Sequence, residues 1–258
     1  MRWTRLFASA FSFLALGAAN AHAAQADFAA SNFQDWAALV VAGDFHAHSG
    51  GPTEAFDNAR RDVVAALVTA GFKPDNVVQL SVRPERYPEA KAGTSDLLGV
   101  AQGLAYAAGK APGGCLLYLT SHGAPQGAVV GDEVMSPRFA QKMVDNACGK
   151  RPTVVVISAC YSGVFVPYLA KPNRMVLTAA RPDRSSFGCG ESDVYPYFDA
   201  CVLESLPRVK EFPALGRAAQ SCVSAREKAE NLTPASEPQM SVGGEMALTL
   251  PLLTFAGR

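Results

Sequence analysis

Two short apolar runs constrain the fold of this chain more than any other feature of its sequence. Residues 116–121 are apolar up to a final Thr-Ser pair, and residues 154–158 are apolar up to a final Ser. Runs of this length and composition are typical of strands that are buried on both faces of a parallel sheet. The sequence therefore predicts an α/β fold in which these two segments are central strands.

A reactive residue follows each of these runs. His122 and Gly123 come directly after the first run, and Cys160 follows the second by one alanine. The carboxyl ends of neighbouring parallel strands meet at one edge of a sheet, about 4.8 Å apart, so we expect the imidazole and the thiol to lie side by side. A thiol beside an imidazole is the arrangement of a cysteine nucleophile with its base, and the backbone N–H groups of Gly123 and Cys160 are candidate oxyanion donors.

Strand and helix patterns alternate along the rest of the chain, which indicates a mostly parallel sheet covered by helices. Further strands are expected at 37–43, 76–82 and 175–180, a hairpin-like segment near 129–132, and a terminal strand region at 240–250. Helices are expected at 53–70, 95–109, 136–147, 197–206 and 213–229.

The first residues resemble a secretory signal. Arg2 and Arg5 precede an apolar stretch at 6–16, and Ala21-His22-Ala23 has the small-x-small pattern of a cleavage site. We therefore expect a signal peptide at 1–23 and a single exported domain at 24–258, which would be periplasmic or secreted. The apolar stretch is too short for a comfortable membrane span, and no integral membrane anchor is expected.

Charge and motifs exclude several other classes of protein. Lys and Arg number 23 and Asp and Glu also number 23, and no polybasic run occurs, so nothing favours a nucleic-acid partner. The chain has no Gly-x-Ser-x-Gly elbow of a serine hydrolase and no glycine-rich phosphate loop.

Six cysteines in an exported chain suggest disulfides. Cys115 and Cys148 each lie near the start of one of the two apolar strands, which makes a bridge between them geometrically reasonable. Two of Cys189, Cys201 and Cys222 could pair, and the sequence does not choose between them.

The segment Asp44-Phe45-His46-Ala47-His48 allows three interpretations. It could be a loop that only packs, or a helper in which Asp44 or His46 orients His122 or contacts substrate. It could also bind zinc, because two histidines at i and i+2 of a strand point to one face. The mature chain offers few further histidines as ligands, so the zinc site is the weakest of the three and no metal is expected.

Three ordered blocks, at 117–123, 157–163 and 178–189, resemble the catalytic blocks and the pocket loop of the legumain family of cysteine peptidases. The resemblance implies a caspase-like αβα sandwich with a mostly parallel sheet of about six strands, and no cofactor. It also implies that Cys160 is the nucleophile, His122 the general base and acid, and Gly123 an oxyanion donor. Ser185 and Ser186 would line the specificity pocket.

The chain departs from that family where specificity is set. The family carries an Asn and an Arg before the first helix, whereas residues 50–55 here read Gly-Gly-Pro-Thr-Glu-Ala. The family's acidic residue before Ala-Cys is Ser158 here, and Asp199 lies near its acidic pocket residue with an offset of one. Both Ser158 and Asp199 are therefore expected at the substrate pocket, but a preference for cleavage after Asn is not implied.

These features together favour an exported cysteine endopeptidase of bacterial type that acts on peptide or protein substrates. Two alternatives remain open at this stage. The same dyad could pass the acyl group to an amine, as in a transamidase or ligase, or the pocket could bind peptides without cutting them.

Overall fold

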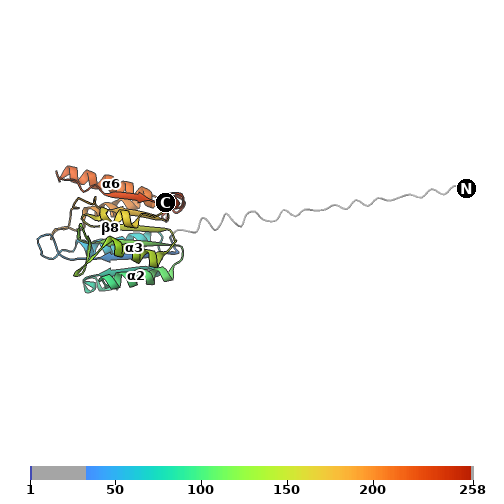
Figure 1. The fold of residues 1–258 in the computed structure, drawn as a ribbon, viewed down its shortest axis with the longest axis horizontal. Coiled ribbons are helices and arrows are strands. Elements are labelled where there is room, and N and C mark those ends of the chain that lie inside the picture. The colour runs from blue at the N-terminus through green and yellow to red at the C-terminus, as the bar shows by residue number, and fades with distance from the viewer. Residues whose placement is uncertain (2–32, 257–258) are drawn as a thin grey trace. The chain divides into compact units, whose positions relative to one another are not determined.

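A sheet of seven strands organises the part of the chain that the computed structural model describes, Met1 and residues 33–256 (Figure 1). The signal peptide expected at 1–23 lies outside the described residues, apart from Met1. The strands are β1 (Trp36–Ala42), β2 (Val77–Ser81), β3 (Gly93–Thr94), β4 (Gly114–Thr120), β8 (Thr153–Ser158), β9 (Arg174–Thr178) and β10 (Gln239–Val242). Their order in the sheet is β10-β9-β8-β4-β1-β2-β3, and only β10 runs antiparallel to its neighbour.

The prediction of a strand at 240–250 is wrong beyond Val242, where β10 ends. Gly243 turns the chain, and its backbone N–H donates to the carbonyl of Arg174 at 2.8 Å. A side chain at Gly243 would lie 2.0 Å from the carbonyl oxygen of Lys171, so the turn requires glycine. Helix α7 (Gly244–Thr249) follows in place of the strand.

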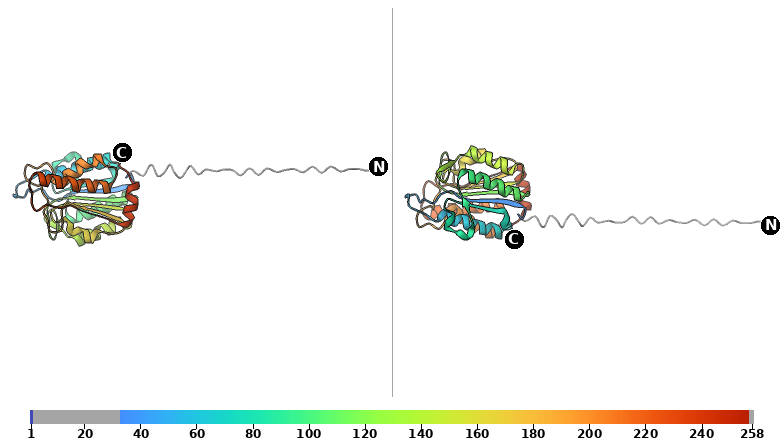
Figure 2. Two further views of the ribbon diagram at one scale, coloured as in Figure 1. Left: turned by 90° about the horizontal axis from the view of Figure 1, so that it is seen from above. Right: turned by 90° about the horizontal axis from the view of Figure 1, so that it is seen from below.

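Helices cover both faces of the sheet, as two views at right angles to the first show (Figure 2). Helices α1 (Ala55–Thr69), α5 (Tyr197–Ser205) and α6 (Phe212–Ala229) pack on one face. Helices α2 (Leu97–Lys110), α3 (Pro137–Cys148) and α4 (Val166–Leu169) pack on the other. Within the described residues, no helix combines the length and apolarity that a bilayer span requires.

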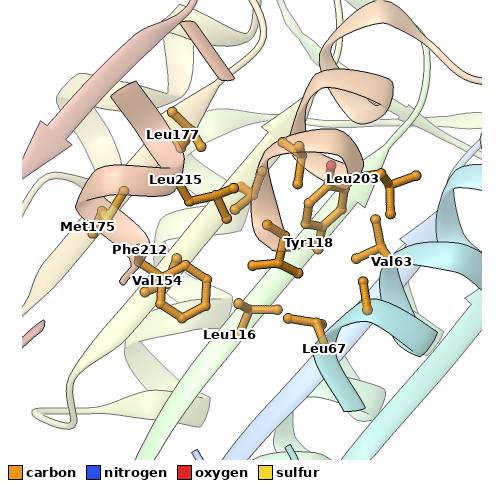
Figure 3. Close-up of a pocket in the computed structure, with 14 residues that line it drawn as sticks. Val63, Leu67, Leu116, Tyr118, Val154, Met175, Leu177, Leu203, Phe212 and Leu215 are labelled. Carbon is orange, nitrogen blue, oxygen red and sulfur yellow. The ribbon is translucent and has the colours of Figure 1, made fainter. Parts of the chain in front are cut away.

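Two apolar cores result from the alternation of side chains along the strands. Leu116 and Tyr118 of β4 point toward α1, α5 and α6, whereas Leu117 and Leu119 point toward α2 and α3. The first core contains a void of about 20 Å³ lined by apolar side chains, including Leu116, Phe212 and Leu215 (Figure 3). A void of this size and lining is a packing defect of the core and offers no room for a substrate.

The helix starts follow from short-range capping. The Asp96 side chain accepts a hydrogen bond from Gly99 N at 2.6 Å at the start of α2, and Ser136 accepts one from Phe139 N at 3.2 Å at the start of α3. Pro137 occupies the first position of α3, where its missing N–H is not needed.

Two disulfides cross-link the described fold. Cys115–Cys148 joins the start of β4 to the end of α3, as the sequence suggested, and Cys201–Cys222 joins α5 to α6. Cys160 and Cys189 are free.

Candidate active site

The register of the sheet brings His122 and Cys160 to the same height. Thr120 of β4 pairs with Ser158 of β8, and each candidate residue lies two positions beyond its paired residue. Ala42 of β1 pairs with Thr120 in the same way, so Asp44 also lies two positions beyond. The three side chains thus share the carboxyl edge of the sheet, near the point where β1 has β2 on one side and β4 on the other. Open α/β sheets bind their ligands at such a switch in strand order.

His122 is held by the loop that follows β1. Its Nε2 donates to the carbonyl oxygen of His46 at 2.8 Å, and the Phe56 ring of α1 meets the imidazole edge to face at 5.1 Å between centroids. Because a carbonyl only accepts hydrogen bonds, Nε2 carries the proton in the neutral ring. The Nδ1 atom of His122 is therefore the nitrogen that can accept a proton.

Asp44 shapes the loop that holds His122. Its Oδ1 accepts from the backbone N–H groups of Phe45 and His46, at 2.7 and 3.1 Å, and pairs with His46 Nδ1 at 2.7 Å. The Asp44 side chain is only 11% exposed, whereas the His46 side chain is 52% exposed. The contribution of His46 to His122 is therefore its backbone carbonyl, which Asp44 orients.

Cys160 lies at the tight turn after β8. The thiol contacts Ser186, whose backbone N–H donates to Sγ at 3.3 Å and whose carbonyl oxygen lies 3.6 Å away. Tyr161, the next residue, has a φ of 58°, a left-handed conformation that is uncommon outside glycine, asparagine and aspartate. This turn starts a short 3-10 helix, η5 (Ser162–Phe165), and leaves Cys160 partly accessible at the rim.

Two backbone donors face the same region. The N–H of Cys160 has no protein acceptor among the described residues. Gly123 opposes Ala128 in the hairpin of β5 (Gly123–Ala124) and β6 (Gly127–Val130). The adjacent pair is hydrogen-bonded through Val129 N and His122 O, so the Gly123 N–H points away from β6. A side chain at Gly123 would lie 2.0 Å from the Cys160 carbonyl oxygen, so only glycine allows this close approach.

His122 and Cys160 line one pocket of about 340 Å³. The other lining residues come from the loop after β1 and from the long loop after β9: His48, Ser185, Ser186, Phe187, Gly188, Cys189, Gly190 and Asp193. The predicted residues Ser185 and Ser186 are thus brought together with His122 and Cys160. Cys189 and Asp193 were not singled out from the sequence as pocket residues.

The second free thiol, Cys189, also lines the pocket. Burial raises the pKa of the Cys189 thiol to about 11, and negative charge on Cys160, Asp193 and Asp44 acts in the same direction. Cys189 therefore stays protonated near neutral pH and is a poor nucleophile.

Asp199 and Ser158 do not line the pocket, in contrast to the expectation from the sequence. Asp199 is fully buried and accepts hydrogen bonds from the hydroxyls of Tyr118 at 2.5 Å, Thr120 at 2.6 Å and Ser158 at 2.9 Å. Burial raises the pKa of the Asp199 carboxyl to about 6, against the opposing effect of its three donors. These residues form a polar layer beneath the rim, because Thr120 and Ser158 precede His122 and Cys160 by two positions.

The histidine pair does not form a shared metal site. His46 is engaged with Asp44, whereas His48 lines the pocket. Within the described part of the chain, no three His, Cys, Asp or Glu side chains are grouped to hold a metal ion.

Two comparisons with known proteins define the class of the protein. Caspase-1 from Spodoptera frugiperda matches with a TM-score of 0.58 and 14% sequence identity, over 82% of this chain and 87% of that chain. The fold is therefore caspase-like. A model of the Peptidase C13 family matches residues 82–211, which is half of the 258-residue chain. The chain belongs to this family, the legumain family of cysteine peptidases. A search of curated protein sequences found no match.

Proposed function

We propose that this cysteine peptidase is an exported endopeptidase that cleaves peptide bonds through Cys160 and His122. The observation that carries the proposal is the shared pocket, in which the free Cys160 thiol and the His122 imidazole stand at equal register on neighbouring strands. The two disulfides support export, because structural disulfides persist in oxidising compartments.

The first half of the reaction forms an acyl-enzyme. His122 Nδ1 takes the proton of the Cys160 thiol, and the thiolate attacks the carbonyl carbon of the scissile bond. The carbonyl oxygen becomes an oxyanion that the N–H groups of Gly123 and Cys160 stabilise; such donors contribute roughly 3–4 kcal/mol in other acyl-transfer enzymes. His122 then gives its proton to the departing amine, and a thioester on Cys160 remains.

Hydrolysis completes the cycle. His122 Nδ1 takes a proton from a water molecule, and the resulting hydroxide attacks the thioester carbon. The new tetrahedral intermediate uses the same two backbone donors. Its collapse releases the carboxylic acid product, and the proton on His122 returns to the Cys160 sulfur.

The test is the Cys160→Ala variant, measured on a library of fluorogenic peptides and by alkylation with iodoacetamide. We expect peptide turnover to fall by roughly 10³-fold or more, because no other thiolate is available to attack. Alkylation at near-neutral pH should disappear as well, whereas a Cys189→Ala variant should still be labelled at Cys160. Unchanged turnover in Cys160→Ala would refute the assignment.

A further inference from the structure

The lining of the pocket carries a negative charge that no lysine or arginine in the lining offsets. Asp193 is the only carboxylate among the lining residues, and no lysine or arginine lines the pocket within the described part of the chain. Asp193 Oδ2 accepts a hydrogen bond from Gly190 N at 2.6 Å, which fixes the carboxylate, and Oδ1 accepts none from the described residues. One oxygen of a positioned carboxylate is therefore free for a ligand.

Glu191, next to the pocket residue Gly190, is a second carboxylate and lies against the loop before α1. Glu191 Oε1 accepts a hydrogen bond from the Ser49 hydroxyl at 2.7 Å, and a Cβ on Gly51 would lie 2.3 Å from the same oxygen. Residues 43–54, which form this loop, include no lysine or arginine. An acidic substrate side chain thus finds no lysine or arginine in this loop or among the lining residues.

The arginines nearest in sequence are occupied elsewhere. Arg181 pairs with Asp183 and Glu237, and Arg184 pairs with Asp183. These pairs leave the negative charge of Asp193 uncompensated.

The segment that carries Asp193 is also held in place by hydrogen bonds on both sides of this residue. The Thr53 hydroxyl donates to Gly190 O at 2.8 Å, and Asn58 Nδ2 donates to Val194 O at 3.1 Å, so the segment around Asp193 is tied to α1 and the loop before it. Cys160, Cys189 and Asp193 line the same pocket. A substrate side chain that enters this pocket from a carbonyl at Cys160 therefore shares its space with the Asp193 carboxylate.

We propose that this pocket takes a positively charged side chain, arginine or lysine, on the residue whose carbonyl Cys160 attacks. The inference rests on the proposed peptidase function and names its substrate class. The free oxygen of Asp193 accepts the charged hydrogen bond from the substrate cation, and Glu191 adds negative potential at the rim.

The direct test compares fluorogenic peptides that differ only in arginine or citrulline before the scissile bond. Citrulline keeps the shape and several donors of arginine but has no charge. We expect kcat/KM to be at least about tenfold higher for arginine, because a hydrogen bond between charged groups is much stronger than a neutral one. Lysine should likewise exceed its Nε-acetylated form, and Asn and Asp substrates should be poor.

The Asp193→Asn variant assigns the preference to one residue. Asn keeps an oxygen that can accept from Gly190 N, so the loop should stay in place. We expect kcat/KM for the arginine peptide to fall to within about threefold of kcat/KM for the citrulline peptide. The matched control is Asp75→Asn, an exposed carboxylate near the start of β2 at the opposite end of the sheet, which should keep the wild-type ratio.

Binding to the Cys160→Ala protein separates this inference from the peptidase assignment. A peptide ending in arginine should bind at least about tenfold more tightly than its citrulline analogue by calorimetry, and Asp193→Asn should remove the difference. If the charged peptide binds selectively but no peptide is cut by the wild type, the peptidase proposal fails and the pocket assignment stands. If cleavage depends on Cys160 but occurs after Asn, Asp or citrulline as readily as after arginine, the proposed charge preference is overturned and the proposed peptidase function stands. Neither cleavage nor selective binding would overturn both.

Discussion

Two carboxylates in the segment after β9 have opposite surroundings. Asp199 is fully buried, with three hydroxyl donors and a pKa raised to about 6 by burial, whereas Asp193 lines an open pocket with one backbone donor. The buried group connects β4, β8 and α5, and the open group faces the space beside Cys160. The partners and burial of a carboxylate near an active site, and not its place in the sequence, therefore decide whether it serves structure or recognition.

The pH dependence of stability is the largest effect expected from the buried carboxylate, Asp199. The pKa of Asp199 is raised from 3.8 to about 6 on folding, so its contribution to stability is complete below pH 3.8 and is lost as the pH rises through 6. The full loss is roughly 3 kcal/mol, of which about 2 kcal/mol falls between pH 4.5 and 7. In urea titrations, we expect the free energy of unfolding of the wild type, relative to that of Asp199→Asn, to drop by about 2 kcal/mol between pH 4.5 and 7.

The Asp199→Asn variant is itself the reference in this measurement, because its amide does not titrate. A flat difference for Asp199→Asn would contradict a buried carboxyl with a raised pKa.

A third carboxylate, Asp44, tests whether a residue can act on the site without lining it. Asp44→Ala should lower kcat by roughly 30-fold, equivalent to about 2 kcal/mol, with little change in KM, because the His46 carbonyl no longer fixes the proton-accepting nitrogen of His122. Asp44→Asn keeps an acceptor for the two backbone N–H groups and should restore most of kcat. Steady-state kinetics on one cleavable peptide provide both values, and an effect confined to KM would indicate substrate contact instead.

The smallest expected effect separates two serines that were both predicted to lie at the pocket. Ser158→Ala removes a buried hydroxyl that donates to Asp199 and should cost about 1.5 kcal/mol of unfolding free energy. Ser185→Ala removes an exposed hydroxyl and should change it by less than about 0.5 kcal/mol. Chemical denaturation midpoints measure both, and equal losses would remove the distinction between the buried layer and the pocket.

Much of the fold could be predicted because the sequence encodes it locally. The apolar runs at 116–119 and 154–157 fall inside β4 and β8, and the caps Asp96 and Ser136 mark the starts of α2 and α3. The prediction of a strand after Val242 was wrong because the periodicity of apolar residues does not reveal that Gly243 lies close to the backbone at Lys171. Two-residue strands such as β3 have no pattern of their own, so seven strands were found where about six were expected.

From the residues themselves, the candidate site could be predicted only where it depends on strand ends, whereas Ser185 and Ser186 were predicted from the resemblance to the legumain family. His122 and Cys160 follow apolar runs, and parallel pairing fixes their relation. Asp193 lies in a long loop whose path depends on contacts with Thr53 and Asn58, far away in the sequence, and no short motif signals such contacts. The same limit explains why Asp199 was placed in the pocket, because its burial beneath the rim depends on where α5 packs.

The pairing of Thr120 with Ser158 has a consequence for how this protein tolerates change in chain length. His122 and Cys160 each lie two residues beyond that pair, so inserting or deleting one residue after either strand would move one of the two side chains away from the other. Loops elsewhere on the surface can lengthen at little cost in free energy. The relative position of the two reacting atoms thus depends on the number of residues between Thr120 and His122 and between Ser158 and Cys160. Natural or engineered variants preserve it by keeping both of these short segments at their present length.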